Sequence, residues 1–448
     1  MTRLVIPMTQ EQVPVKSPMR SLVLVCMTML MLAAGSARAE LLIRITEGVE
    51  SAIPIAVVPF KETGTMPPGD KISSIVRSDL TMSGEFNPLE PEKMLSLPSR
   101  QSDVYFRDWR MLGQRYLLVG EVTRRGERLE ARYELFDVNR EERILGETAA
   151  APASNARSLA HHISDKVYEA ITGETGVFST KLAYVTVTGQ GDDIRYRLQV
   201  SDIDGKRAKV RLESDEPILS PAWSPDGKTL AYVSFETGKP VIFTHELATG
   251  KRQKVADFRG LNSAPAWGPD GKSLLMTLSR DGNAEVYNMD LSTRELTRLT
   301  NHWAIDTEGV WDHAGRGIFF TSDRSGGPQI YHMERPGAEA RRITFGSRYN
   351  ARPRPGPDGQ YVYHVHQRDN AFLIARTNLN TGEESIVTRT EADESPSLAP
   401  NGRMLIYATE QNGDSVLTVV SADGGAAYSL PAAEGEVRDP AWGPVTTR

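Results

Sequence analysis

Few residues of this 448-residue chain stand at spacings that suit metal binding or catalysis. His364 and His366 are two residues apart and would lie on one face of a strand. There they would supply half of a metal site or, in the interpretation we favour, be two packed or hydrated histidines. Asp202-Ile-Asp-Gly205 resembles the start of a calcium loop, but the rest of that motif is absent, so we expect a hairpin turn. His161 and His162 are adjacent and would not share one face of a helix.

Four carboxylates form a second candidate group. Asp306, Glu308, Glu394 and Asp439 would converge if the segments that carry them line one channel. Such a cluster would suit a hydrolase or lyase, or a calcium-dependent carbohydrate binder, and the residues alone leave both alternatives open. The sequence contains no phosphate-binding glycine-rich loop, no Gly-x-Ser-x-Gly elbow and no His-Glu-x-x-His helix. We therefore assign no catalytic residue, no metal and no cofactor.

An internal repeat determines where these residues lie. Pro-Ala-Trp-Ser-Pro-Asp-Gly at 221–227, with the apolar run that follows it to Ser234, returns as Pro265–Leu278 and more loosely as Gly309–Ser322. One column of the repeat advances in steps of 44, 44, 44, 43 and 44 residues, through positions 223, 267, 311, 355, 398 and 442. A fixed period of this length, built from short strands and turns, is typical of a β-propeller blade.

Each period contains four strand-like segments, and the two ends of the array are complementary. In one period the segments are Ala264–Trp267, Ser273–Leu278, Ala284–Asp290 and Glu295–Thr300. The first period begins at Lys181–Thr186 without an opening strand, whereas the chain ends on a surplus opening strand, Asp439–Trp442. We predict that the C-terminal strand completes the first of six blades, which removes the free edges of the array.

The first 39 residues have the features of an export signal. Arg20 precedes an apolar run from Leu22 to Ala34, and Ala37-Arg-Ala39 supplies small residues before Glu40. The run is too short to span a bilayer. It contains Cys26, the only cysteine, so the mature chain would have none. The net charge of −6 comes with no basic patch, which argues against nucleic acid as a partner.

Residues 40–176 lack the repeat and predict a small α/β domain ahead of a propeller over 177–448. Its helices are expected at Asp70–Leu80, from an N-cap at Ser102 to Leu112, and at Asn155–Thr172. Its strands are expected at Ile53–Phe60, Tyr116–Val122, Leu129–Asp137 and Ile144–Thr148. The fold class is thus an α/β N-terminal domain followed by a six-bladed all-β propeller.

Two regions are candidates for recognition. The first is the set of loops before the opening strands, which are polar, differ between blades and would ring one mouth of the channel: 261–264, 305–308, 349–352, 392–395 and 436–439. They are either a binding surface or ordinary solvated loops. The second is the strand-like segment that starts at Glu40. It would dock in a groove, add to a partner's sheet edge, or be an edge strand of its own domain.

The whole mature chain resembles the TolB family, the periplasmic component of the Tol-Pal system. The resemblance is carried by the export signal, Ile55–Phe60 at the start of the α/β domain, Pro221–Gly227 and Ser395–Gly402. The irregular copies Trp311–Gly315 and Pro353–Pro357 depart from the pattern and put local blade geometry in doubt.

The resemblance implies a non-enzymatic, monomeric periplasmic adaptor. It would support outer-membrane integrity and invagination during cell division, and it would reach membranes only through its partners. It would bind the lipoprotein Pal at the channel mouth, through Leu261, Asn262, Ala264, Thr307 and Glu308. It would bind TolA through the mature N-terminal segment, Glu40, Leu41, Leu42, Ile43, Arg44 and Ile45. The alternative is a periplasmic hydrolase or lyase with its site in the channel.

Overall fold

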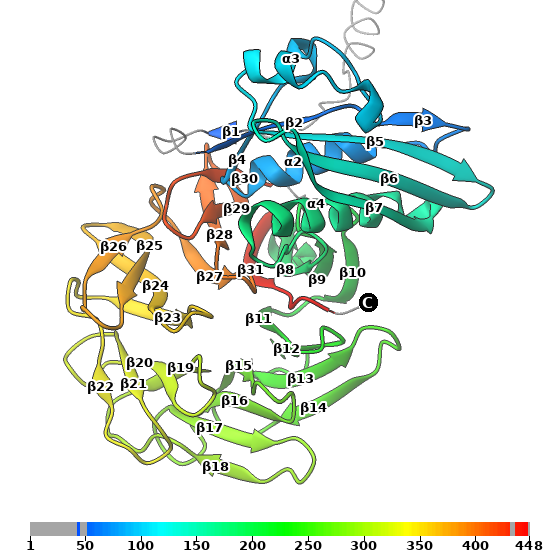
Figure 1. The fold of residues 1–448 in the computed structure, drawn as a ribbon. Helices are drawn as coiled ribbons and strands as arrows, with labels where there is room; N and C mark the ends of the chain where they lie inside the picture. Colours follow the sequence, from blue (N-terminus) through cyan, green and yellow to red (C-terminus); the bar gives the residue numbers. More distant parts are fainter. Residues whose placement is uncertain (1–42, 45–51, 431–434, 447–448) are drawn as a thin grey trace, which may run out of the picture. The chain divides into compact units, whose positions relative to one another are not determined.

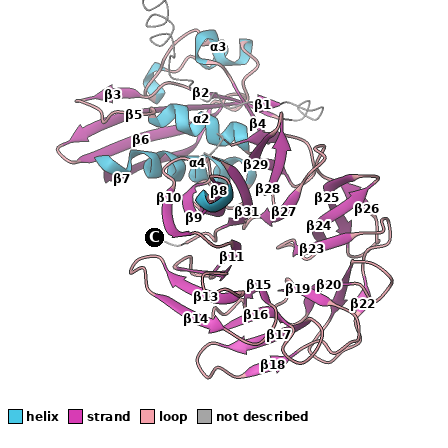
Figure 2. Cartoon of the chain, turned by 180° about the vertical axis from the view of Figure 1, so that it is seen from behind, coloured by secondary structure: helices cyan, strands magenta, loops and turns pink. Residues whose placement is uncertain are grey.

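The computed structural model describes residues 43–44, 52–430 and 435–446. Figure 1 shows a ring of small sheets that follows a mixed helix-and-strand domain along the chain, and in Figure 2 every labelled helix belongs to that first domain. The described chain thus has the two predicted architectures in the predicted order.

The N-terminal domain is built on a mixed sheet with strand order β4-β2-β5-β6-β7, and β3 also pairs with β5. Its strands are β2 (Ile53–Val57), β3 (Lys61–Thr63), β4 (Phe86–Pro88), β5 (Tyr116–Arg125), β6 (Arg128–Asp137) and β7 (Glu142–Pro152). Its helices are α2 (Ile72–Met82), α3 (Phe106–Met111) and α4 (Ala156–Thr172). β2 pairs parallel with β4 and with β5, whereas β6 pairs antiparallel with β5 and with β7. A chain that first alternates strand and helix and then forms hairpins would give this pattern.

Alternating side chains of the sheet bury both of its faces. Tyr116 and Leu118 of β5 point to the core shared with α2 and α4, whereas Leu117 and Val119 join Trp109 of α3 in a second core. This two-sided burial explains the almost continuous apolar run in β5.

The helix predicted from Ser102 is wrong at its start. Ser102 lies in a short 3-10 turn, Gln101–Asp103, and α3 begins at Phe106 with no side-chain cap. The Gln101 N–H donates to the Glu134 carboxylate at 3.1 Å, so a tertiary contact with the sheet holds this stretch. Ser102 Oγ donates to Asp103 at 2.9 Å and is not available as a cap.

Six four-stranded sheets form the propeller. Blade 1 is β31 (Glu436–Trp442), β8 (Lys181–Thr188), β9 (Arg195–Asp202) and β10 (Lys209–Ser214). Blade 2 is β11 (Ile218–Trp223), β12 (Thr229–Ser234), β13 (Val241–Glu246) and β14 (Arg252–Ala256); blade 3 is β15 (Asn262–Trp267), β16 (Ser273–Leu278), β17 (Glu285–Asp290) and β18 (Leu296–Arg298). Blade 4 is β19 (Asp306–Trp311), β20 (Ile318–Ser322), β21 (Gln329–Met333) and β22 (Arg341–Arg342). Blade 5 is β23 (Asn350–Pro355), β24 (Tyr361–Arg368), β25 (Ala371–Asn378) and β26 (Glu384–Ile386); blade 6 is β27 (Glu394–Leu398), β28 (Met404–Gln411), β29 (Asp414–Ser421) and β30 (Ala427–Ser429).

The predicted closure by the C-terminal strand is confirmed. β31 pairs antiparallel with β8, which puts Trp442 opposite Leu182 and Ala441 opposite Ala183. The Trp442 indole donates from Nε1 to Thr180 Oγ1 at 2.8 Å. The last strand of the chain therefore supplies the first strand of blade 1, in the same register that opening strands have in the other blades.

Buried polar side chains recur with the period of the blades. Asn262, Asp306, Asn350 and Asp393 begin or immediately precede successive opening strands, and all four are fully buried. Thr300, Thr344 and Thr388 recur in the same way, and each hydroxyl accepts the N–H of a third-strand residue at 2.8–3.0 Å. Because unpaired buried polar groups are costly, the threonine contacts hold each connection on the third strand of its own blade, and Asn350 Nδ2 donates to Gln329 of the preceding blade at 2.9 Å.

The closure predicts that alanine substitutions of two tryptophans will change the free energy of unfolding by different amounts. Trp442 is buried, so Trp442→Ala should lower the free energy of unfolding by about 3–5 kcal/mol. Trp303→Ala removes an exposed indole and should change it by less than about 0.5 kcal/mol. Urea unfolding of both variants measures the two values. Equal effects would show that the closing strand does not carry the ring's stability.

Candidate partner-binding channel and its mouth

The opening strands of the six blades line a channel and share one backbone irregularity. Each strand has a register shift, and at that shift a non-glycine residue adopts a positive φ between 49° and 57°. These six residues are Ser220, Ala264, Glu308, Arg352, Ser395 and Asp439. A left-handed conformation costs a non-glycine residue about 1 kcal/mol or more. All six line the same cavity, so the bulge brings one residue of every blade to the channel wall.

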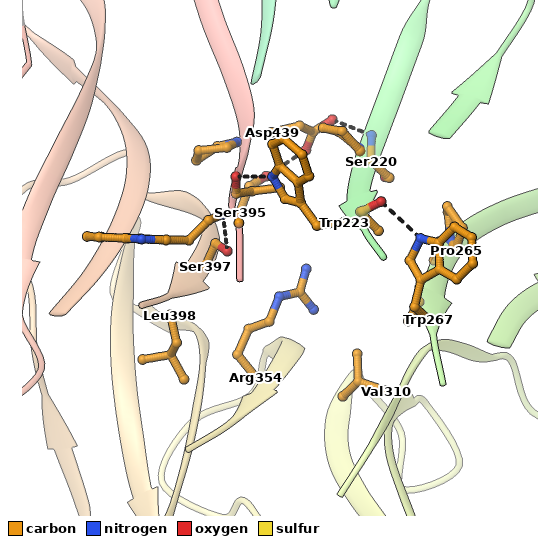
Figure 3. A pocket seen from close by; sticks show the side chains of 18 of the residues that line it. Ser220, Trp223, Pro265, Trp267, Val310, Arg354, Ser395, Ser397, Leu398 and Asp439 are labelled. Carbon is orange, nitrogen blue, oxygen red and sulfur yellow. Dashed lines mark hydrogen bonds between the residues drawn. The ribbon is translucent and has the colours of Figure 1, made fainter. Parts of the chain in front are cut away.

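The channel encloses a cavity of about 400 Å³. Figure 3 shows Arg354 directed into the open space, with Trp223 and Trp267 on one side and Ser397 and Leu398 on the other. Trp223 Nε1 donates to Ala441 O at 3.0 Å and Trp267 Nε1 donates to Ala222 O at 3.1 Å. Each of these tryptophans thus joins its blade to the opening strand of the preceding blade.

An ion-pair network closes part of the channel wall. The Arg352 guanidinium lies 3.1 Å from Asp439 and 3.4 Å from Glu308. Asp439 also accepts the Ser220 N–H at 3.0 Å and the Ser395 hydroxyl at 2.7 Å. Burial opposes ionisation of Asp439, but the Arg352 charge and these hydrogen bonds hold the pKa of its carboxyl below the usual value. The two channel carboxylates are therefore already neutralised by protein.

The four carboxylates considered from the sequence do not form one cluster. Glu308 and Asp439 both pair with Arg352, and Glu394 lies close enough for its charge to act on Arg352 and Asp439. Asp306 is fully buried and accepts two hydrogen bonds from Arg324, at 2.9 and 2.7 Å, and Glu394 is exposed at the start of β27. Neither the acid–base pair of a hydrolase nor an unpaired calcium site is assembled by these four residues.

The loops before the opening strands are less polar than predicted. Four apolar side chains, here called the apolar rim, lie exposed in three successive connections between blades: Leu261 (38% exposed), Trp303 (79%), Ile305 (50%) and Phe345 (71%). Leu261 N–H donates to Ser279 Oγ and Ile305 N–H donates to Asp323 Oδ1, both at 2.8 Å. These bonds attach the connections to the neighbouring turns, so the rim is presented by a fixed backbone. Trp303 and Phe345 were missed because they occupy positions that the repeat does not share.

The five residues predicted to face Pal lie in different environments. Leu261 is on the apolar rim, and Ala264 and Glu308 line the channel. Thr307 Oγ1 lies 3.2 Å from Thr277 Oγ1 of the preceding blade. Asn262 is fully buried, accepts the Phe258 N–H at 3.0 Å and donates to Phe258 O at 2.9 Å, so it shapes the loop from inside.

The described part of the predicted TolA segment is a strand. β1 (Ile43–Arg44) pairs antiparallel with β30, which places Ile43 opposite Tyr428 and Arg44 opposite Ala427. This adds a fifth strand to the sheet of blade 6. Glu40, Leu41, Leu42 and Ile45 lie outside the described residues.

Asp202–Gly205 is the predicted hairpin turn, and it carries a cluster of charges. Gly205 N–H donates to Asp202 O at 3.0 Å in the connection between β9 and β10. The buried Asp202 carboxylate pairs with Arg207 at 2.7 Å and with Lys181. His161 of α4 lies between Asp202, at 3.6 Å, and Asp79 of α2, at 2.8 Å. The turn is thus held by basic side chains from both domains.

His364 and His366 are packed, as the favoured interpretation predicted. Both are buried on β24, and Glu384 of β26, which the sequence analysis did not single out, lies beside them.

In the part of the chain that the structure describes, no helix has the length and apolar character needed to cross a bilayer.

Comparison with known proteins matches both parts of the chain. A family model described as the TolB beta propeller domain matches residues 168–446, and one described as the TolB amino-terminal domain matches residues 41–144. The Tol-Pal system protein TolB of Hahella chejuensis is 53% identical over 423 residues, which cover 94% of this chain and 98% of that protein. The Pseudomonas aeruginosa protein of the same name is 52% identical over 429 residues, 95% of this chain and 99% of that protein. The crystal structure of TolB from Acinetobacter baumannii superposes with a TM-score of 0.82 at 40% identity and covers 91% of this chain and 100% of that one.

His161 in the buried charge cluster and His245 on β13 should titrate at different pH values. Burial disfavours the His161 imidazolium, but Asp79 and Asp202 overcome this and raise its pKa to about 10. A raised folded pKa stabilises the protein fully below the unfolded value of about 6.5, and that contribution is lost as the pH rises through about 10. Burial and Arg252 instead lower the pKa of His245.

An NMR titration of the imidazole carbon-bound protons distinguishes the two. His161 should remain protonated at pH 8, whereas His245 should be neutral at pH 7. A His161 signal that titrates at or below pH 6.5 would contradict the ion-pair assignment. His161→Gln identifies the resonance.

Proposed function

The chain belongs to the TolB family of Tol-Pal system proteins, and on that premise we propose that it is a non-enzymatic adaptor that works in the periplasm. The export-signal features of residues 1–39 support the compartment. The pairing of the channel carboxylates with Arg352 supports a binding role over hydrolysis or eliminative cleavage, because both carboxylates are engaged by protein.

We place the Pal-binding surface at the mouth of the channel. The observation that carries this assignment is the apolar rim. Trp303 and Phe345 expose most of their surface on connections whose backbone is bonded nearby, at the Ile305 N–H for the first and at Ser347 O for the second. Large exposed aromatic side chains on a rigid scaffold are the usual anchors of protein interfaces. Ala264 and Glu308 line the channel and would face whatever part of Pal enters it.

We place the TolA-binding surface on the mature N-terminal segment, residues 40–50. Ile43 and Arg44 of this segment pair with β30, and β1 is the edge strand of that sheet. An edge strand is paired on one side alone, so the segment would leave blade 6 and add to a partner's sheet instead. A partner that binds the docked and free states unequally shifts their populations by its differential affinity. Pal binding would thereby control the availability of the segment to TolA.

Through these two contacts the protein would couple Pal to TolA, and so support outer-membrane integrity and invagination during division. It would act as a monomer and reach both membranes through its partners. No specific observation favours a second function.

A pull-down from solubilised envelope tests the two surfaces separately. The bait is the mature chain, compared with a form that lacks residues 40–50 and with the double variant Trp303→Ala/Ile305→Ala. We expect the intact chain to recover Pal and TolA, the truncated chain to recover Pal alone, and the rim variant to lose Pal. Loss of interface anchors typically costs 2 kcal/mol or more each, about 30-fold in affinity.

Tyr105→Ala is the matched control, because Tyr105 is an equally exposed aromatic residue on the N-terminal domain. It should recover both partners as the intact chain does. If the rim variant recovered Pal normally, the rim would not be the binding surface. If the intact chain recovered neither protein, the adaptor function itself would be wrong.

A further inference from the structure

One group of metal-ligating side chains lies outside the channel and its mouth. His364 and His366 of β24 and Glu384 of β26 share one face of blade 5, and one ligand atom from each lies within 4.8 Å of the other two. Both histidines are buried, and the Glu384 side chain is 16% exposed. The group is therefore inside the protein with one edge open to solvent, at the outermost strand of the blade.

The separations within the group fit a small cation. Glu384 Oε1 lies 3.1 Å from His366 Nδ1, and Glu384 Oε2 lies 3.7 Å from His364 Nε2. Ligand atoms bound tetrahedrally at Zn²⁺–N and Zn²⁺–O distances of about 2.0–2.1 Å are about 3.3 Å apart. The two observed spacings lie on either side of that value, one at each oxygen of Glu384, and one ligand atom from each of the three residues lies within 4.8 Å of the others.

Protein contacts leave part of this group unsatisfied. Glu384 Oε2 is buried and has no hydrogen-bond partner among the described residues. His366 Nδ1 lies 3.1 Å from both Asn350 Oδ1 and Glu384 Oε1, and a single N–H cannot serve both acceptors well. A buried unpaired carboxylate oxygen is costly, and a bound cation would relieve that cost.

Gly346 keeps room for the carboxylate. A Cβ at this position would lie 2.4 Å from Glu384 Oε1. Any other residue at position 346 would displace Glu384 from the histidines, so the glycine preserves the space that the three ligands need.

The residue types of the group suit metal binding. Two imidazoles and one carboxylate are a common ligand set of protein zinc sites. His364 Nε2 lies 2.9 Å from Thr377 Oγ1, a contact that a bound cation would replace.

A second cluster shows what a filled site looks like in this protein. His161, Asp202 and Asp204 lie equally close together, but Arg157, Lys181 and Arg207 already pair with their carboxylates. Among the described residues, no lysine or arginine forms an ion pair with Glu384. Protein cations occupy the cluster of His161, Asp202 and Asp204, whereas the cluster of His364, His366 and Glu384 offers its carboxylate to an external cation.

We propose that His364, His366 and Glu384 form a binding site for a divalent transition-metal cation of the zinc class. The cation would join β24 to β26 and so fasten the outer strand of blade 5. His366 also contacts Asn350, whose Nδ2 donates to Gln329 of blade 4 at 2.9 Å. A metal at this position would therefore stabilise the junction of two blades, independently of any partner at the channel mouth.

Titration calorimetry with Zn²⁺ on the chelator-stripped mature chain tests the proposal. We expect one site per chain, a higher midpoint of thermal unfolding with Zn²⁺, and no comparable effect of Mg²⁺, which prefers oxygen ligands. Glu384→Gln and His366→Asn should each weaken Zn²⁺ binding at least about 10-fold. That is the minimum for loss of a direct ligand, because even outer-shell changes cost 10–100-fold.

His332→Asn is the matched control. His332 lies 3.3 Å from Asp312 in blade 4 and forms a histidine–carboxylate pair without a second histidine. This variant should bind Zn²⁺ as the wild type does. Co²⁺ added to the wild-type chain gives a readout that needs no variant, since a tetrahedral site with nitrogen ligands produces intense visible absorption that Zn²⁺ then displaces.

Absence of Zn²⁺ binding by the wild-type chain would overturn the proposal and leave the group as a hydrogen-bonded contact between strands. Equal binding by Glu384→Gln, His366→Asn and His332→Asn would also overturn it, because the metal would then be held elsewhere. A featureless Co²⁺ spectrum would exclude the tetrahedral geometry on which the spacing argument depends.

Discussion

The pairing of the C-terminal strand β31 with β8 is the contact on which the rest of this structure depends. The four blade strands of every other blade form a local meander of residues close in sequence, and β1 adds an edge strand to blade 6. Blade 1 joins β8 to β31, which lie at the two ends of a stretch of about 260 residues. Its pairing therefore carries the loss of chain entropy that closing the ring requires. Once it is closed, each opening strand has a neighbour on both sides. The channel wall, its six left-handed residues and the ion pairs of Arg352 then become possible.

The ring explains why recognition and stability lie at different places in the blades. Residues that recur at the blade period are buried and hydrogen-bonded, such as Asn262, Asp306 and Asn350. Residues that break the period are exposed on the connections between blades, such as Trp303 and Phe345. A repeat can keep its buried scaffold positions constant while the exposed side chains of its connections vary.

The same division accounts for what the sequence could predict. The 44-residue column predicted six blades and the closing strand, since a period reports what all blades share. It could not predict the apolar rim, which is specific to three connections, nor the burial of Asn262, which follows from tertiary hydrogen bonds. His364 and His366 predicted a shared face by their spacing, but Glu384 joins them from a strand twenty residues away, through a hairpin whose register the sequence does not state. Ser102 failed as a helix cap because the neighbouring Gln101 is bound to Glu134 on the sheet.

Hydrogen–deuterium exchange of the mature chain, with and without purified Pal, tests the central claim that partner recognition occurs at the channel mouth. The account predicts slower exchange in the connections 257–261, 299–305 and 343–349 on addition of Pal. It also predicts changed exchange at residues 40–50 and in β30, because Pal shifts the balance between the docked and free states of the N-terminal segment. Protection at the Pro-Asp-Gly turns on the opposite side of the blades, or on the sheet of the N-terminal domain, with the three connections unchanged, would contradict it.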